Sequence, residues 1–226
     1  MLLQVSPTGP PRRPAWFDTL LAEVDEAFEL ASADTPGWPD PHPDRNPADD
    51  EYSRCLNPGK YRILDARVEA WAQVLARGLA TIEEIPAGPW VGAPRGPDDH
   101  HRVRRVVPAS PGGLTLILAS TVVGGEPFGI DIGVTQLGLP TAFVDTVPDC
   151  GCDACDSGSA DLLATLDGWV LTVARGGVVH ARSERARVTQ TVDGWQGSGE
   201  DDRMFAWLDA PFVPDEVVRW VGTPWL

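Results

Sequence analysis

Three of the four cysteines in the chain lie close together in the sequence and could bind a metal ion. Cys150, Cys152 and Cys155 form a C-x-C-x2-C pattern. Zinc binds thiolates at about 2.3 Å, so the sulfurs of a tetrahedral site lie roughly 3.7 Å apart. Gly151 gives the chain freedom to turn between the first two ligands, and a helix beginning just after Cys155 would curl the third toward them. The pattern therefore predicts a metal centre, with zinc as the ion.

Acidic residues flank the three thiols in the sequence, and they bear on the chemistry to expect. Negative charge raises the pKa of a nearby thiol and disfavours the thiolate that a nucleophile requires. The N-terminus of a following helix acts in the opposite sense, but by only about 0.3–1 kcal/mol. A divalent cation is stabilised by thiolates and carboxylates alike, so a metal ion is favoured over a reactive thiol. The acidic residues are Asp149, Asp153, Asp156 and Asp161.

Three other states of these cysteines are compatible with the sequence. They could be ordinary reduced thiols, a redox-sensing pair, or a disulfide between Cys152 and Cys155. A reducing cytoplasm disfavours a lasting disulfide. Iron–sulfur clusters are usually bound by motifs with two or more residues between ligands, so the single residue between Cys150 and Cys152 disfavours such a cluster. A metal ion is the preferred interpretation.

A fourth ligand would complete a tetrahedral site, and the remaining cysteine is the best candidate. Cys55 lies in a loop immediately before a predicted helix, where a crosslink to a distant part of the chain would be useful. Four cysteines make a closed, structural zinc site, whereas three ligands and an open position are compatible with catalysis. His100, His101 or His180 could serve instead, although a lone histidine on a strand is more often packed or solvated.

Helices are expected on both sides of the central part of the chain. Apolar residues recur at helical spacing in three segments. Asn57 is predicted to cap the second helix, with Pro58 in its first turn, and Ser157 or Ser159 is predicted to cap the third. The predicted helices cover about residues 15–31, 57–78 and 159–175.

Strands are expected in the second half, where the apolar residues change to alternation and short buried runs. The predicted strands cover residues 102–107, 114–123, 128–136, 142–145, 178–182 and 187–192. Residues 35–52 and 80–101 are predicted to be long loops because proline, glycine and aspartate are frequent there. Residues 196–202 are predicted to be a mobile polar segment. The tail after residue 205 carries several large apolar side chains and should pack back on the protein.

Together these elements predict an α+β fold, with a mainly antiparallel sheet of about five strands packed with three helices. We expect a single domain over residues 1–226. Its helical part would cover about residues 15–100, and its sheet-containing part about residues 101–226.

The charge of the chain limits its partners. The formal net charge is −15 at pH 7, and Lys60 is the only lysine. Phosphate backbones and anionic membrane surfaces repel such a chain, so we expect neither nucleic acid nor a membrane as a partner, while a basic protein would suit the charge. No apolar run approaches the roughly 20 residues of a membrane span, and the first residues lack a secretory signal pattern. A cytoplasmic protein is expected, and its oligomeric state is left open.

The sequence supports two functional hypotheses. It contains no Walker-type phosphate loop, dinucleotide-binding glycine motif, nucleophile elbow or H-E-x-x-H motif, so no catalytic or organic-cofactor residues are assigned. The preferred hypothesis is a binding or regulatory protein stabilised by a structural zinc ion. The alternative is a zinc-dependent hydrolase with an open coordination position, in which His100 or His101 moves protons.

Three segments also resemble an uncharacterised family of actinobacterial proteins, a domain of unknown function. They are CLNPGKYRILDARVEAW, DCGCDACDSGSADLLATLDGWV and VTQTVDGW, and together they span about residues 55–195. The resemblance implies a bacterial cytoplasmic protein without an assigned activity. It also implies that the cysteine motif belongs to the fold.

Overall fold

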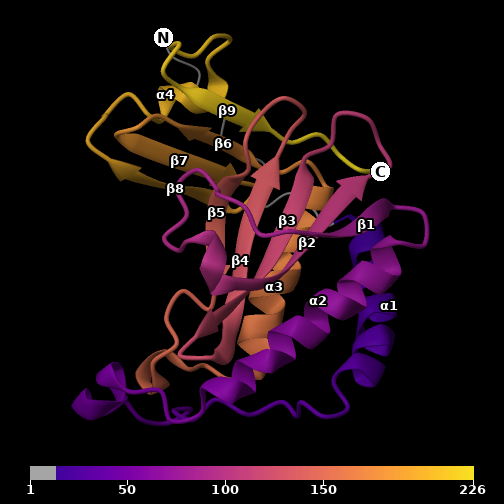
Figure 1. Ribbon diagram of the computed structural model, residues 1–226, viewed down its shortest axis with the longest axis vertical. Helices are drawn as coiled ribbons and strands as arrows, with labels where there is room; N and C mark the ends of the chain where they lie inside the picture. The colour runs from indigo at the N-terminus through magenta and orange to yellow at the C-terminus, as the bar shows by residue number, and fades with distance from the viewer. Residues whose placement is uncertain (1–13) are drawn as a thin grey trace, which may run out of the picture.

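The computed structural model describes residues 14–226, and over this range the chain forms four helices and nine strands in two antiparallel sheets. The first thirteen residues, where the sequence argued against a secretory signal, lie outside the described range. Figure 1 shows a five-stranded sheet at the centre and a four-stranded sheet at one end of it. The predicted α+β fold, with a five-stranded antiparallel sheet and three long helices, is confirmed.

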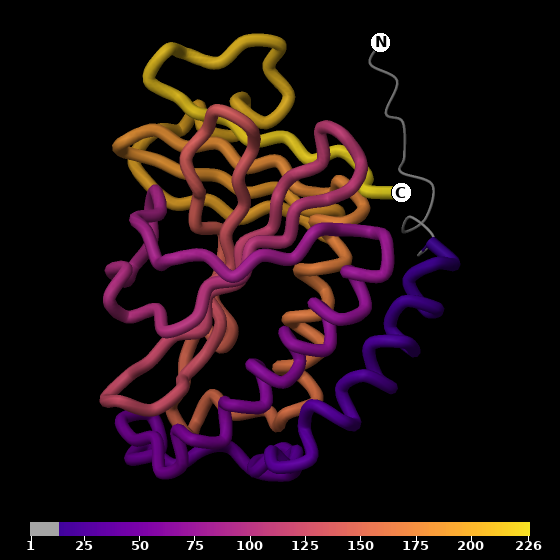
Figure 2. Tube along the Cα trace, turned by 45° about the vertical axis from the view of Figure 1, so that its right-hand side comes forward, coloured from indigo at the N-terminus to yellow at the C-terminus, as the bar shows by residue number. Residues whose placement is uncertain are grey.

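The helices gather on one side of the five-stranded sheet, as Figure 2 shows. Helix α2 and helix α3 pack on the sheet, and α1 packs on the outside of α2. The α-helices are α1 Ala15–Ala31, α2 Arg62–Leu75, α3 Ser159–Ala174 and α4 Ala206–Asp209. The 3-10 turns are η1 Asp49–Ser53, η2 Pro58–Tyr61, η3 Pro97–Asp99 and η4 Asp153–Cys155.

The five-stranded sheet has the order β1-β2-β3-β4-β5, with every pair antiparallel. Its strands are β1 Ala80–Ile85, β2 His100–Pro108, β3 Thr115–Val123, β4 Glu126–Thr135 and β5 Ala142–Val147. Strand β3 is buried on both faces. Leu116 and Leu118 join the core under the helices, while Ile117 and Ala119 join a smaller cluster with Trp90 on the opposite face.

The four-stranded sheet has the order β8-β7-β6-β9. Its strands are β6 Val179–Arg182, β7 Ala186–Thr191, β8 Gly194–Gly199 and β9 Val218–Val221. Buried Trp220 of β9 donates its indole N–H to the carbonyl of Pro140, 3.0 Å away, and so links this sheet to the start of β5. The opposite face is covered by the segment around α4, where Trp207 and Met204 pack on Val188. The tail therefore packs back on the protein as its apolar residues predict.

Two segments that the sequence predicts to be irregular are strands, so those predictions are wrong. Residues 80–101 contain β1 and the beginning of β2, and residues 196–202 contain part of β8. Strand β1 carries Glu83 and Glu84, which reduce its apolar signal, but both lie opposite arginines of β2 in register. Strand β8 is glycine-rich and exposed, and its pairing with β7 makes it a strand.

The predicted caps are also wrong. Asn57 makes no side-chain hydrogen bond to the helix that follows, which begins as the turn η2. Gly158, not a serine, precedes α3, with φ of 91°. The Ser159 hydroxyl instead accepts from the main-chain N–H of Trp38 at 3.0 Å and donates to the Trp38 carbonyl at 3.1 Å. A contact between distant segments thus takes the place of a local cap.

A buried guanidinium links the three long helices. Arg67 of α2 is 4% exposed and forms a bidentate pair with Asp167 of α3, with distances of 2.8 and 2.7 Å. Its Nη1 also lies 2.8 Å from a carboxylate oxygen of Asp25 in α1. The indole N–H of Trp71 donates to Asp167 at 2.7 Å. Every partner of this charge comes from a helix.

Removing Asp167 should therefore be costly. We expect Asp167→Ala to lower the free energy of unfolding by about 3–5 kcal/mol, because Arg67 loses its buried partner. The exposed pair of Arg77 and Glu23, 3.2 Å apart, provides the control, and Arg77→Ala should cost about 0–1 kcal/mol. Urea unfolding followed by tryptophan fluorescence measures both. Similar small losses in the two variants would contradict the role assigned to Asp167.

His180 on β6 is buried as a neutral side chain. It is fully buried, its Nδ1 lies 2.8 Å from the Thr189 hydroxyl, and its ring packs on Trp220. Burial, together with the nearby charges of Arg182 and Arg187, lowers the pKa of His180 from 6.5 to about 4. The unfolded chain therefore binds a proton at His180 more readily than the folded chain does.

This difference predicts how stability depends on pH. The contribution of His180 is fully present above its unfolded pKa of 6.5 and is lost as the pH falls toward 4. Between pH 7 and pH 5 the loss should be about 2 kcal/mol. Unfolding free energies at the two pH values, compared between the native chain and His180→Gln, separate the contribution of His180 from that of the carboxylates. An equal pH dependence in both proteins would rule out the contribution of His180.

Candidate metal centre

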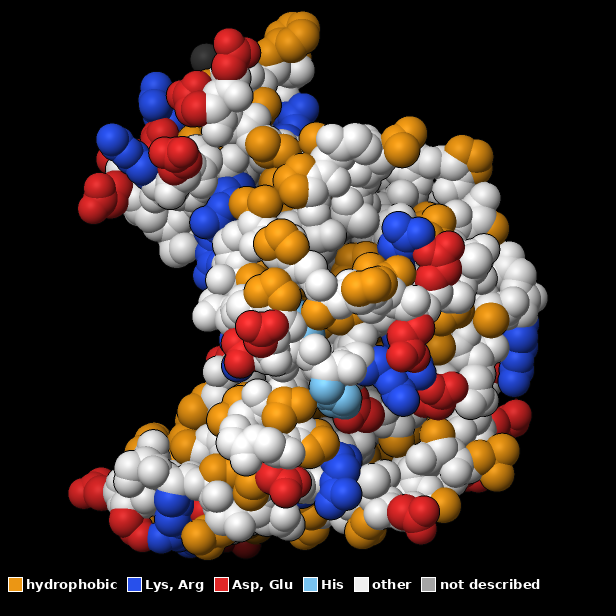
Figure 3. Space-filling model, viewed as in Figure 1, with side chains coloured by type: hydrophobic (Ala, Val, Ile, Leu, Met, Phe, Trp, Pro, Cys, Tyr) orange, Lys and Arg blue, Asp and Glu red, His pale blue; other side chains and the backbone are white. Residues whose placement is uncertain are grey.

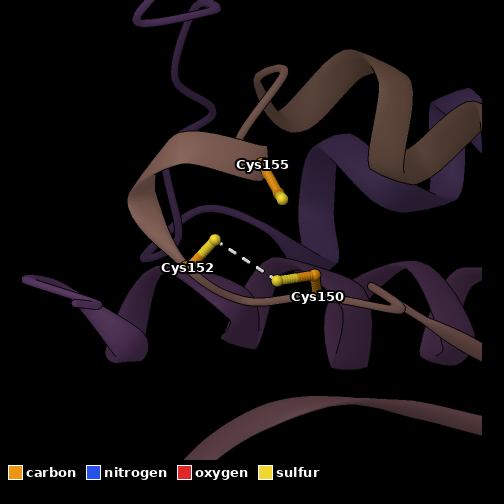
Figure 4. Close-up of side chains that lie close together, drawn as sticks. All are labelled: Cys150, Cys152 and Cys155. Carbon is orange, nitrogen blue, oxygen red and sulfur yellow. Dashed lines mark hydrogen bonds between the residues drawn. The ribbon is translucent and has the colours of Figure 1, made fainter. Parts of the chain in front are cut away.

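The three clustered cysteines converge on one point. Cys150 lies in the loop after β5, Cys152 precedes η4 and Cys155 ends it. Their sulfurs all lie within 4.8 Å of one another, and those of Cys150 and Cys152 are 3.3 Å apart. Figure 4 shows the three side chains directed toward a common space. These separations are close to the roughly 3.7 Å of a tetrahedral zinc–thiolate site, so the residues fit a metal ion.

Gly151 is required at this position for a reason that differs from the predicted one. Its φ is not positive, so it does not supply a left-handed turn. A Cβ at Gly151 would collide with the ring of Phe128, which packs directly on the main chain. The carbonyl of Gly151 also faces the buried hydroxyl of Tyr61 at 3.4 Å. The loop between the first two cysteines is therefore fixed by aromatic side chains.

Two of the neighbouring aspartates are neutralised by cations from the preceding part of the chain. Asp153 accepts from Arg54 Nε at 3.0 Å. Asp156 is 9% exposed, forms an ion pair with Lys60, and accepts from the Trp38 indole at 2.9 and 3.0 Å. The Lys60 ammonium also lies 5.2 Å from the centroid of the Trp38 ring. The only lysine in the sequence thus serves the cysteine loop.

Hydrogen bonds among the thiols change their expected acidity. Burial raises the pKa of the Cys152 thiol, but hydrogen bonds from Cys150 and Cys155 outweigh it and hold the pKa below its usual range. The same hydrogen bonds raise the pKa of Cys155 to about 12. The lowered pKa of Cys152 therefore differs from the direction expected from its acidic neighbours. One sulfur accepts protons from two others, and a metal ion would replace those protons on binding.

Cys55 is held beside the cysteine loop, although its sulfur is not among the three that lie within 4.8 Å of one another. The carbonyl of Arg54 accepts from the main-chain N–H of Asp153 at 2.8 Å. The N–H of Leu56 donates to the Asp153 carboxylate at 3.1 Å. Both neighbours of Cys55 are thus bonded to a residue of η4, and Cys55 as the fourth ligand stays a prediction.

The histidines named as alternative ligands lie on the sheets. His100 is buried, with its Nε2 2.9 Å from Asp131, and His180 faces Thr189. His101 is half-exposed, 4.0 Å from Asp65. Among the described residues, the group of convergent ligand atoms contains the three cysteines and no histidine.

Several residues that position this centre were not found by sequence reasoning. They come from the proline-rich segment 32–56 and from η2, far from the cysteines in sequence, and include Trp38, Arg54 and Lys60. The one available signal was that Lys60 is the only lysine of an acidic chain. It did not indicate that Asp156 is the partner of Lys60.

The packing at Gly151 gives a testable coupling. We expect Gly151→Ala to lower the unfolding free energy by about 1–3 kcal/mol, because the added methyl meets Phe128. Adding Phe128→Leu should recover part of that loss, since the smaller side chain leaves room. Gly168→Ala is the matched control, because nothing lies within 4 Å of a Cβ at that helical position, and it should stabilise by about 0.5–1 kcal/mol. Strictly additive effects of the first two changes would contradict the contact.

Comparison with known proteins identifies the family but gives no activity. The model of the Family of unknown function (DUF6226) matches residues 24–217, so the chain belongs to this family. No curated protein and no solved structure matches the chain. Within residues 14–226, no helix combines the length and apolar character needed to cross a membrane.

Proposed function

For this member of a family of unknown function, we propose a binding protein whose fold is stabilised by one zinc ion. Cys150, Cys152 and Cys155 would hold the ion, with Cys55 as the fourth ligand. The convergence of the three sulfurs within 4.8 Å is the observation that carries the proposal. Zinc bound by four cysteines has no open position and acts structurally.

The surroundings of the cysteines support a structural role. The loop lies between β5 and α3, and it binds the segment before α2 through Asp153 and Asp156. A metal ion here would join a strand, a helix and a long connecting segment that otherwise meet through polar contacts. A bound zinc ion would act as a Lewis acid. In the proposal, its positive charge holds the thiolates together.

The proposal extends to the partner and the compartment. A formal charge of −15 favours a basic protein as the partner and disfavours nucleic acid. A cytoplasmic location is part of the proposal, because a reducing compartment keeps the thiols free to bind a metal.

The metal content of protein purified without added metal tests the centre. We expect about one zinc ion per chain, loss of the ion in Cys152→Ser, and a lower melting temperature after chelation. Ser157→Ala, a change in the same loop that removes no thiol, should keep both zinc and stability. Less than about 0.2 metal per chain, with four freely titratable thiols, would refute the proposal.

Cys55→Ser distinguishes a structural site from a catalytic one. If Cys55 is the fourth ligand, the variant should bind zinc more weakly and melt at a lower temperature. Unchanged zinc content and stability would remove Cys55 from the site and favour the alternative of a zinc-dependent hydrolase with an open position.

A further inference from the structure

A cleft lies where the four-stranded sheet meets the edge of the five-stranded sheet. One cavity of about 410 Å³ lies between the two sheets, and a second of about 380 Å³ adjoins it around the end of the β6–β7 hairpin. The two cavities share Ser183, Glu184 and Glu216. Such volumes are within the range of small-molecule sites. Figure 3 shows basic side chains on the surface formed by the four-stranded sheet, above a hollow in the side of the molecule.

An arginine in this cleft has an unbalanced charge. Arg182 of β6 lies directly opposite Arg187 of β7 in the sheet register, and like charges in such positions are destabilising. In the part of the chain described by the structure, neither guanidinium has a carboxylate oxygen within ion-pair distance. Burial and the charge of Arg187 both lower the pKa of Arg182. The fold itself gains nothing from this pair of charges.

Two arginines of the five-stranded sheet are paired with acids across their strands. Glu83 of β1 lies opposite Arg105 of β2, and Glu84 lies opposite Arg104. Acidic residues number 33 against 18 basic ones, so carboxylates are plentiful. The Arg182–Arg187 pair is therefore not a consequence of too few acidic side chains, and an external anion would relieve it.

The guanidinium of Arg182 is held in position. A Cβ at Gly92 would overlap it and lie 2.7 Å from its Cζ, so the group rests on the main chain of Gly92. The adjacent Val91 is fixed to the edge of β5, donating to the Thr141 carbonyl at 2.8 Å and accepting from the Phe143 N–H at 3.0 Å. The cation therefore sits against ordered main chain at the wall of the cavity.

The other walls of the cavity are apolar on one side and acidic on the other. The apolar residues that line the cavity are Val91, Pro140, Val218 and Trp220. Glu184 and Glu216 are exposed, and among the described residues neither has an ion-pair partner. A doubly charged anion such as phosphate would be repelled by these carboxylates, whereas an ammonium group would be attracted.

We propose that this cleft binds a small zwitterion with an apolar body, such as a short apolar peptide. Its carboxylate would pair with Arg182, its ammonium with Glu184 or Glu216, and its apolar part would cover Val218 and Pro140. The planar guanidinium suits a carboxylate because it can bind both oxygens. This site is separate from the cysteine centre and does not depend on a bound metal.

Calorimetric titration of the full chain with the dipeptide L-leucyl-L-leucine tests the site. The dipeptide should bind, while its C-terminal amide and its N-acetyl derivative should each bind about tenfold or more weakly. These analogues test the two charged contacts without changing the protein. Absence of dipeptide binding, equal binding of the amide, or equally tight binding of inorganic phosphate would overturn the proposal.

Arg182→Gln provides a second test with two readouts. It should weaken dipeptide binding about tenfold or more and, in the absence of ligand, raise the melting temperature because the repulsion with Arg187 is removed. If Arg182 only stabilised the fold, its replacement would lower the melting temperature instead. Arg77→Gln, an exposed change in the turn after α2, should leave binding unchanged. Unaltered affinity in Arg182→Gln would refute the assignment.

Discussion

The buried guanidinium of Arg67 is the interaction on which the helical layer depends. A charge that is removed from water requires carboxylate partners at close range, and Arg67 obtains them from α1 and α3. These contacts favour the packing of the three long helices in which Asp25, Arg67 and Asp167 meet. Because α3 is fixed by this contact, its first turn, and with it the loop that carries the cysteines, is fixed as well.

The cysteine loop is the second place where distant segments meet. Its charges are balanced locally, since Asp153 binds Arg54 and Asp156 binds Lys60. This leaves the sulfurs to interact with one another. Charges are not balanced in this way in the cleft between the two sheets. There, Arg182 has no acidic partner among residues 14–226, although the chain as a whole is acidic. The aspartates of the cysteine loop are thus paired within the protein, whereas Arg182 is left for an external anion.

Sequence reasoning was most successful where one local signal dominates. The period of apolar residues gave α1 its observed bounds, and the buried runs located β3 and β4. It failed where a contact with residues far away in sequence determines the local structure. Strand β1 owes its place to arginines of β2, and the start of α3 is fixed by Trp38, not by a cap. The spacing of the cysteines predicted which thiols converge, but the cations that neutralise their aspartates are about a hundred residues away in sequence and left no local pattern.

Trp38, Arg54, Lys60 and Arg67 each have a partner in one short stretch, residues 153–167. Chains emerge from the ribosome N-terminus first. During synthesis, α1, the proline-rich segment and α2 are therefore made long before the residues that complete their polar contacts. Until residue 167 has emerged, the charge of Arg67 lacks its α3 partner, although the strands of the five-stranded sheet have already been made. The first half of the molecule is thus expected to remain open during translation and to close when α3 is released.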